Sequence, residues 1–277
     1  MALVPNFVCV TCGVQHAESP EPPAACAICT DERQYVPVDG QRWTTLDGLR
    51  RGHRNEVREE AGLVGIGTEP AFAIGQRALL VPAGGCNVLW DCISLLDDET
   101  VTAVEERGGL RAIAISHPHY YSSLVEWSRA FDDVPVYVHR DDRQWVLRPD
   151  RCVEEWAGET LDLGDGLTLV RCGGHFAGGQ VLHVDRTLLS GDIVQVIPDR
   201  SFVSFMYSYP NLIPLDAPAI RGIVAALEPF EFDRIVGAWW GRVVPADGKA
   251  IVRRSGERYL RAIGAAVPLD TTLTDPR

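Results

Sequence analysis

The sequence predicts an α+β protein in which helices pack on the outside of a sandwich of sheets. From residue 71 onward, short apolar runs broken by glycine and proline indicate antiparallel strands. Strand–helix alternation follows these hairpins and occurs twice, which indicates an α+β or α/β sandwich. The 277 residues, 46% of them hydrophobic, are enough for one large core.

Residues 1–40 form a separate cysteine-rich segment. Cys9-x-x-Cys12 and Cys26-x-x-Cys29 are separated by thirteen residues, and the Pro-rich stretch between them cannot build a core. Two turns with two thiolates each can hold one tetrahedral Zn²⁺ with sulfurs at about 2.3 Å. Two disulfides or free thiols are the alternatives, and disulfides are disfavoured in a chain without an export signal. We expect a zinc-ribbon-like structural knuckle, because four thiolates leave zinc no open position.

The remaining elements follow in order. Residues 41–70 read as a polar connecting segment with short helices, and residues 71–277 as the main domain. Acidic residues at the start of 97–107 and Gly108-Gly109 after it are typical of a capped helix. Further helices are expected at 122–131, 217–227 and 249–263, and strands at 71–74, 77–81, 87–92, 110–116, 134–139, 161–163, 167–172, 181–184, 187–189 and 234–237.

Charge and composition exclude several classes of partner. The formal net charge is −12 and no basic block occurs, which disfavours nucleic-acid binding. No apolar run approaches the roughly 18 residues of a spanning helix. The first residues lack a signal-peptide pattern, so we expect a soluble cytoplasmic protein without a membrane partner. A homo-oligomer stays open, and the expected partner is a small-molecule substrate.

Three histidines and one aspartate follow expected strands. His117 and His119 come after a buried strand, and at i and i+2 of an extended segment both imidazoles point the same way. His175 follows Gly173-Gly174, and Asp192 follows Ser190-Gly191. Each could singly be a core or turn residue, but together they make a credible site for a divalent metal.

At these residues the chain resembles the metallo-β-lactamase fold superfamily, over about residues 71–263. The order of motifs is similar: Leu89-Trp90-Asp91, His-x-His, Gly-Gly-His and Ser-Gly-Asp. The resemblance implies a four-layer αββα sandwich with metals in a groove at the sheet edges, and many members are hydrolases. It also implies that His117, His119 and His175 bind a first metal, that Asp192 bridges to a second, and that Asp91 lies near the site and orients a ligand.

The chain departs from this pattern at the second metal. The family motif continues with an aspartate and a histidine where this sequence has Tyr121 and Ser122. Near the C-terminus, Trp240 stands where members carry a further ligand. Ligands of the first metal are kept and those private to the second are lost, so we predict a mononuclear centre.

Aromatic residues near these motifs are candidates for a substrate pocket. Tyr120 and Tyr121 are placed to donate a hydrogen bond to developing charge in place of the second metal, or to pack beside the site. Four further residues are assigned to the pocket, with core or surface roles as alternatives: Trp239 and Trp240 as a wall, and Phe205 and Tyr207 as part of a roof. Arg242 is either a partner for a substrate anion or a surface residue.

The function predicted is a metal-dependent hydrolase of a small ester, lactone, thioester or amide. Zinc with an open position would lower the pKa of its water toward about 7 and give a hydroxide nucleophile, with Asp192 as ligand or base. One alternative is a non-haem Fe(II) enzyme using His117, His175 and Asp192, similar to the superfamily's persulfide dioxygenases. Another is a non-catalytic binding protein. Zinc is favoured over iron as the catalytic metal.

Overall fold

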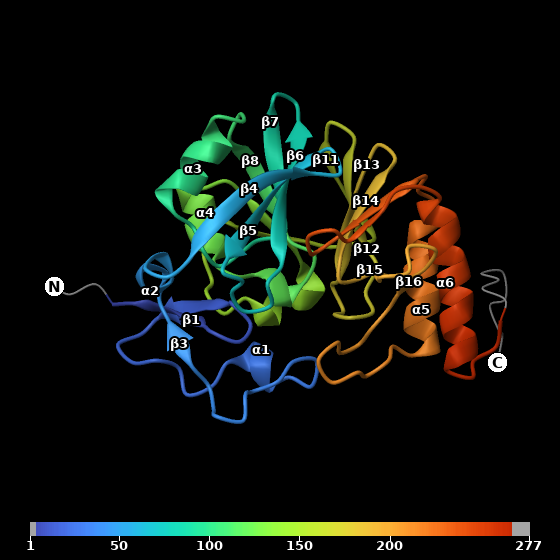
Figure 1. The fold of residues 1–277 in the computed structure, drawn as a ribbon, viewed down its shortest axis with the longest axis horizontal. Coiled ribbons are helices and arrows are strands. Elements are labelled where there is room, and N and C mark those ends of the chain that lie inside the picture. Colours follow the sequence, from blue (N-terminus) through green and yellow to red (C-terminus); the bar gives the residue numbers. More distant parts are fainter. Residues whose placement is uncertain (1–3, 268–277) are drawn as a thin grey trace.

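The computed structural model describes residues 4–267 as two sheets packed face to face with helices on both outer sides (Figure 1). This is the expected αββα sandwich; residues 268–277 of the predicted main domain lie outside the described residues. The first sheet has seven strands in the order β10-β9-β8-β7-β6-β5-β4. Their bounds are β4 Arg54–Glu60, β5 Leu63–Glu69, β6 Arg77–Ala83, β7 Cys86–Trp90, β8 Leu110–Ala114, β9 Val136–His139 and β10 Val153–Trp156.

The second sheet has six strands in the order β11-β12-β13-β14-β17-β18. Hairpins join β11 to β12 and β13 to β14, and β14 and β17 run parallel across the crossover. The hairpins confirm the expected strand pairs at 161–172 and 181–189. The bounds are β11 Thr160–Gly164, β12 Leu167–Arg171, β13 Gln180–Val184, β14 Thr187–Gly191, β17 Arg234–Gly237 and β18 Val243–Val244; a separate pair is β15 Gln195–Val196 with β16 Val203–Ser204.

Helices cover the outer face of each sheet. α3 (Asp98–Glu105) and α4 (Leu124–Ala130) lie against the first sheet, and α5 (Ala217–Leu227) and α6 (Gly248–Ala262) against the second (Figure 1). The side chains of Asp97 and Asp216 accept the hydrogen bonds that begin α3 and α5. Two short 3₁₀ segments, η1 (Pro118–Tyr120) and η2 (Arg140–Trp145), follow β8 and β9. No helix within residues 4–267 is both long and apolar enough to cross a membrane.

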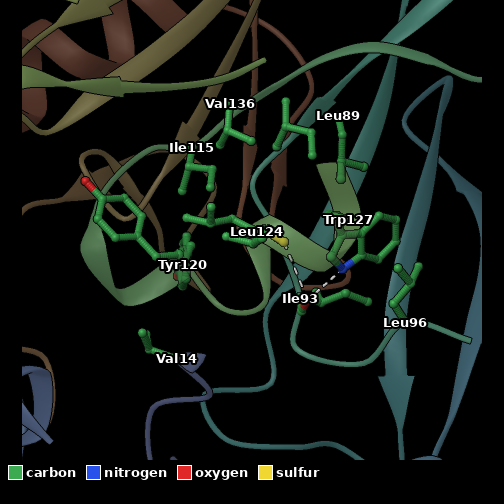
Figure 2. Close-up of a cluster of buried hydrophobic side chains, with 14 of the residues drawn as sticks. Val14, Leu89, Ile93, Leu96, Ile115, Tyr120, Leu124, Trp127 and Val136 are labelled. Atoms are coloured by element: carbon green, nitrogen blue, oxygen red, sulfur yellow. Dashed lines mark hydrogen bonds between the residues drawn. The ribbon is translucent and has the colours of Figure 1, made fainter. Parts of the chain in front are cut away.

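Buried apolar residues fill the space between the sheets and the space beneath the helices. Between the sheets, Trp90 and Leu79 of the first pack with Leu182 and Leu189 of the second. On the other face of the first sheet, Trp127 of α4 is fully buried and donates its indole N–H to Ile93 O at 2.9 Å (Figure 2). Tyr120 belongs to the same cluster, but its hydroxyl points away from it (Figure 2).

The N-terminal unit is a three-stranded sheet attached to one end of the sandwich (Figure 1). It contains β1 (Asn6–Cys9), β2 (Gln15–Glu18) and β3 (Trp43–Thr44), with helix α1 (Ala27–Thr30), and α2 (Leu46–Arg50) follows. Backbone hydrogen bonds from Gln15 N to Ser122 O and from Ala17 N to Leu147 O join it to the main body. Its cysteines belong to the same buried cluster as the residues under α4.

The segment at 41–70 differs from the expected connector of short helices. Trp43–Thr44 joins the N-terminal sheet, whereas β4 and β5 are full strands at the edge of the main sheet. The sequence hides this strand character because β4 is a largely polar edge strand and β5 contains Gly65 and Gly67. A Cβ on either glycine would lie within 2.7 Å of the Trp240 ring, so this aromatic ring replaces the missing side chains. Residues 71–74, expected as a strand, form a turn.

Candidate metal centre

The four N-terminal cysteines converge on one point and are all buried. Cys9 Sγ lies 3.5 Å from Cys29 Sγ, and Cys12 Sγ lies 3.6 Å from Cys26 Sγ. A disulfide would require about 2.05 Å, whereas four sulfurs around one tetrahedral zinc lie about 3.8 Å apart. The spacing therefore fits a four-cysteine zinc site and does not fit two disulfides.

Electrostatics of this cluster also fit a cation. Burial raises the pKa of the Cys12 thiol, whereas hydrogen bonds from Cys12 and Cys29 lower the pKa of Cys26. Four neighbouring thiols therefore cannot all ionise by themselves, and a divalent ion would supply the positive charge that stabilises four thiolates. Gln41 Nε2 also donates to Cys9 Sγ at 3.0 Å.

The second cluster contains His117, His119, His175 and Asp192, whose ligand atoms all lie within 4.8 Å of one another. Each comes from the end of a strand. His117 and His119 follow β8 and bracket the start of η1, His175 precedes β13, and Asp192 follows β14. Gly191, with φ of +49°, permits this approach, because a Cβ there would lie 2.4 Å from Ser116 Oγ.

The imidazole nitrogens are arranged in a way that suits metal ligands. His175 Nδ1 lies 2.6 Å from Tyr207 O and donates to it, which leaves its Nε2 with a lone pair. That Nε2 lies 3.2 Å from His119 Nδ1. His117 Nε2 and His119 Nε2 are buried and make no hydrogen bond in the described part of the chain. Buried polar atoms without partners are rare in folded proteins, and a metal ion is one way to satisfy them.

Burial also sets the protonation of these groups. It lowers the pKa of His117 and His119 well below the usual value and that of His175 to about 4. All three rings are therefore neutral at pH 7, the form that binds a metal. Burial raises the pKa of Asp192 to about 7. Three neutral imidazoles and one carboxylate fit a divalent ion such as zinc.

Tyr120 and Asp91 support this cluster from behind. The hydroxyl of Tyr120, which is fully buried, donates to Asp192 Oδ1 at 2.8 Å. Asp192 Oδ2 remains free to face His117 Nε2, 3.8 Å away. Asp91 Oδ1 accepts the backbone N–H of Ser116 at 2.7 Å, which anchors the segment that carries His117. Burial raises the pKa of Asp91 to about 7.

The cluster opens into a cavity of about 270 Å³. His119, His175 and Asp192 form its polar end, and Trp239 and Ile74 form part of an apolar wall. The indole of Trp239 donates to Ile74 O at 3.1 Å, which fixes this wall. Trp239, predicted as part of a pocket wall, therefore lines the cavity beside the cluster.

Several other predicted residues lie elsewhere. Tyr121 is buried in the core beside residues of the N-terminal unit. It lines a different, very small cavity. Trp240 packs on β5 with Arg58 3.9 Å from its ring centre. Phe205 is fully buried against Tyr259, and Arg242 lines a neighbouring cavity of about 400 Å³. The local sequence does not separate these positions, because the direction of each ring depends on partners far along the chain.

Tyr207, predicted as part of the pocket roof, acts through another atom than expected, and Ser122 makes hydrogen bonds within the core. Tyr207 contacts the site through its backbone carbonyl, while its hydroxyl donates to Glu32 at 2.8 Å. Ser122, at the position of a second-metal histidine, accepts from Gln76 Nε2 and donates to Cys92 O. Within residues 4–267, metal-ligating side chains gather only in the two clusters described above.

Sequence reasoning missed the contribution of the N-terminal unit to this site. Arg33 Nη1 donates to His175 O at 3.3 Å, and its guanidinium lies 3.9 Å from the centre of the Phe176 ring. Gln34 and Tyr35 line the metal cavity. Arg33 and His175 are 142 residues apart, and no signal near Arg33 indicates the contact.

Comparison with solved structures identifies the fold. VMB-1 superposes with a TM-score of 0.59 at 14% identity, over 76% of this chain and 98% of that one. The mono-zinc form of the metallo-β-lactamase FIM-1 from Pseudomonas aeruginosa gives 0.56 at 16%, over 75% and 96%. A metallo-β-lactamase from Pontibacter korlensis gives 0.52 at 14%, over 74% and 92%. The chain therefore has the metallo-β-lactamase fold.

A curated relative is much more similar in sequence. The uncharacterized protein YmaE of Bacillus subtilis (strain 168) is 49% identical over 271 residues, covering 95% of this chain and 98% of its own length. The chain belongs to the family of YmaE. No family model matches the chain.

Proposed function

We propose that this protein is a mononuclear metallo-hydrolase that cleaves an ester, lactone, thioester or amide in a small molecule. The observation that carries the proposal is the buried His117, His119, His175 and Asp192 cluster at the end of an apolar cavity. Its fold supports the same reading, because its structural neighbours include metallo-β-lactamases. The fold by itself does not assign a substrate.

The chain's own residues bind and orient. His117, His119, His175 and Asp192 would hold a divalent ion, which would supply a Lewis acid for the substrate carbonyl and lower the pKa of bound water. Tyr120 fixes one oxygen of Asp192, so the other oxygen faces the metal position in a single orientation. Tyr207 O fixes the ring of His175. Trp239 and Ile74 exclude water from the apolar side of the cavity.

Zinc is the metal proposed for both clusters. Four thiolates select zinc over harder cations, and three imidazoles with a carboxylate suit zinc in a catalytic role. The thiols must be reduced to bind it, so we propose a reducing compartment, the cytoplasm, as the place of action. The proposed partner is a small molecule that enters the cavity.

Metal analysis of protein purified without added metal tests the proposal. We expect two zinc ions per chain in the parent, one in Cys9→Ala/Cys12→Ala and one in His117→Ala. His183→Ala is the matched control, because His183 hydrogen-bonds Glu231 O away from both clusters. A panel of nitrophenyl esters, thioesters and lactones should be hydrolysed by the parent and by His183→Ala, and at least about 100-fold more slowly by His117→Ala.

Other outcomes would redirect the assignment. One iron in the histidine site with oxygen uptake on a persulfide would replace hydrolysis by dioxygenase chemistry. Loss of both metals in His117→Ala would contradict two independent sites. A loaded histidine site without turnover on the whole panel would favour a binding protein.

A further inference from the structure

The N-terminal unit forms part of the wall of the metal cavity. Thr11, within the first Cys-x-x-Cys turn, and Arg33, Gln34 and Tyr35, which follow the second, are four of the twelve residues that line it. The cavity is therefore closed jointly by the knuckle and the main domain. A purely structural zinc knuckle has no need to reach the substrate.

Hydrogen bonds hold the 32–35 segment against the loop beside the metal ligands. Asn211 Nδ2 donates to Glu32 O and Gln34 O, both at 2.9 Å, and Ser208 Oγ donates to Arg33 O at 3.1 Å. This loop follows Tyr207, whose carbonyl holds His175. The knuckle wall and the metal ligand are thus positioned by one short stretch of chain.

The wall of the cavity is electrically neutral outside the metal centre. Arg33 binds Asp31 through both Nε, at 2.6 Å, and Nη2, at 2.8 Å. Its third nitrogen donates to His175 O. All three guanidinium nitrogens of Arg33 therefore have hydrogen-bond partners within the protein. The other described residues of the wall carry no charge. A site of this kind disfavours a charged ligand group, which would lose its hydration without gaining a partner.

Gln34 offers an unused amide in this wall. The residue is 5% exposed, and its Oε1 is buried with no hydrogen-bond partner in the described structure. Both backbone groups are engaged, the N–H with Asp31 O and the carbonyl with Asn211. A buried amide without partners is unfavourable, and a polar group of a bound ligand would satisfy it.

Apolar rings surround the mouth of the cavity. Tyr35 and Tyr209 line it and are 49% and 62% exposed. Val36 and Leu212, on the same two segments, are 41% and 75% exposed. Of these four, Tyr35 and Tyr209 line the cavity itself, and exposed aromatic side chains at a cavity are typical of a binding surface.

We propose that the knuckle is the substrate-recognition element of this enzyme, with Gln34 hydrogen-bonding an uncharged polar group of the substrate and Tyr35 contacting its apolar part. The ligand class is a neutral amide, ester or lactone with an apolar or aromatic body. The inference rests on the proposed function for the reaction, but the binding it describes is measurable without turnover.

Binding is measured by calorimetry with N-(4-nitrophenyl)butanamide, a neutral amide, and with 4-butanamidobenzoate, its anionic analogue. We expect the parent to bind the neutral compound at least tenfold more tightly than the anion. Gln34→Leu keeps the volume and removes the amide, and it should weaken neutral binding about 3- to 10-fold. Tyr35→Ala, at an exposed position that tolerates change, should weaken it to a similar extent.

Kinetics with 4-nitrophenyl butyrate separate recognition from a structural effect. Gln34→Leu should raise KM by the same factor, with kcat within twofold and two zinc ions per chain. Gln195→Leu is the matched control, because Gln195 is a buried glutamine that lines the neighbouring cavity. Its KM and its affinity for the amide should stay within twofold of the parent.

Each of the other outcomes tests a separate part of the proposal. Equal affinity of Gln34→Leu and the parent for the neutral amide would overturn the role of Gln34. Tighter binding of the anion, or no binding of the amide to the parent, would overturn the neutral class. A change in Gln195→Leu without one in Gln34→Leu would move recognition to the other cavity. Amide binding lost in Gln34→Leu while ester hydrolysis is absent throughout would retain this inference and reject the hydrolase.

Discussion

At the scale of single residues, one hydrogen bond sets the orientation of the carboxylate in the metal centre. Tyr120 and Tyr121 are adjacent and both buried, yet they face different partners. Tyr120 donates to Asp192, whereas Tyr121 packs in the core and its hydroxyl makes no hydrogen bond in the described structure. The effects of removing the two hydroxyl groups can therefore be compared directly.

Tyr120→Phe should weaken metal binding at the histidine cluster about 10- to 100-fold. Removal of the hydroxyl leaves Asp192 Oδ1 buried without its donor, and partners of metal ligands typically matter to this extent. Competition with a chelator measures the affinity of the histidine cluster for zinc. The zinc held by the cysteine cluster is counted separately. Tyr121→Phe, which deletes the same atom without a partner, should change it less than twofold; equal losses in both variants would contradict the orienting role.

Asp142 should make the protein less stable as the pH rises. It is 2% exposed, and burial raises its pKa from 3.8 to about 6. Between these values the folded chain binds a proton that the unfolded chain has released, so the free energy of unfolding falls as pH rises from about 4 to 6. Above pH 6 the full cost, up to about 3 kcal/mol, is present.

Asp142→Asn tests this sign. Its amide oxygen can still accept the N–H of Gly178, which Asp142 Oδ1 accepts at 2.8 Å. Urea unfolding should show the variant more stable than the parent by about 1–3 kcal/mol at pH 7.5, and by less at pH 5. A difference that is constant over this range would mean that the Asp142 charge is not the cause.

At the scale of elements, β5 and Trp240 depend on each other. The Gly65 and Gly67 positions leave room for the indole, and the guanidinium of Arg58 lies over its ring. Arg77, 1% exposed, binds Glu60 and donates to Gly237 O, which ties the tryptophan turn to the sheet. Trp240 is thereby drawn away from the metal, to which Trp239 remains adjacent.

Gly65→Ala should destabilise the protein by about 1–3 kcal/mol. The new Cβ would lie 2.6 Å from two atoms of the Trp240 ring, and overpacking of this kind costs that much. Gly222→Ala, on the exposed face of α5 with no atom within 4 Å, should instead stabilise by about 0.5–1 kcal/mol. Urea midpoints that move in the same direction for both would contradict the packing argument.

At the scale of the whole molecule, the knuckle and the metal cavity form one connected structure. The cysteines share a buried cluster with residues under α4, and the 32–35 segment is hydrogen-bonded to the 207–211 loop. We expect a unit of about 40 residues with so little core to depend on a bound metal ion to fold. Loss of the ion proposed for the cysteine cluster should therefore also affect the residues of the 207–211 loop beside the cavity.

The double substitution Cys26→Ser/Cys29→Ser should increase solvent exposure of the backbone on both sides of the contact between the knuckle and the 207–211 loop. Hydrogen–deuterium exchange should show lost protection in residues 5–45 and in 205–213, and unchanged protection in β12–β14 and α5–α6. The histidine cluster should keep its metal, because none of its four ligands belongs to the knuckle. Unchanged exchange at 205–213 would contradict the coupling.

Whether the sequence predicted a feature correctly depends on how far apart in the chain the interacting residues lie. Local patterns were enough for the hairpins, for the helices α3 and α5, and for the two clusters of candidate ligands. These features depend on residues close in the chain or on motifs placed at strand ends. The prediction of a connector was wrong for the polar edge strand β4 and the glycine-containing β5, because tertiary packing outweighs their weak propensity.

Only the tertiary structure determines which residues line the cavity. Spacing predicted that His117, His119, His175 and Asp192 would meet, since the ends of neighbouring strands meet at one edge of a sandwich. It did not predict that Trp240 turns toward β5, that Tyr121 enters the core, or that Arg33 and Gln34 reach the metal cavity. Each of these depends on packing between segments distant in the chain, which no local pattern encodes.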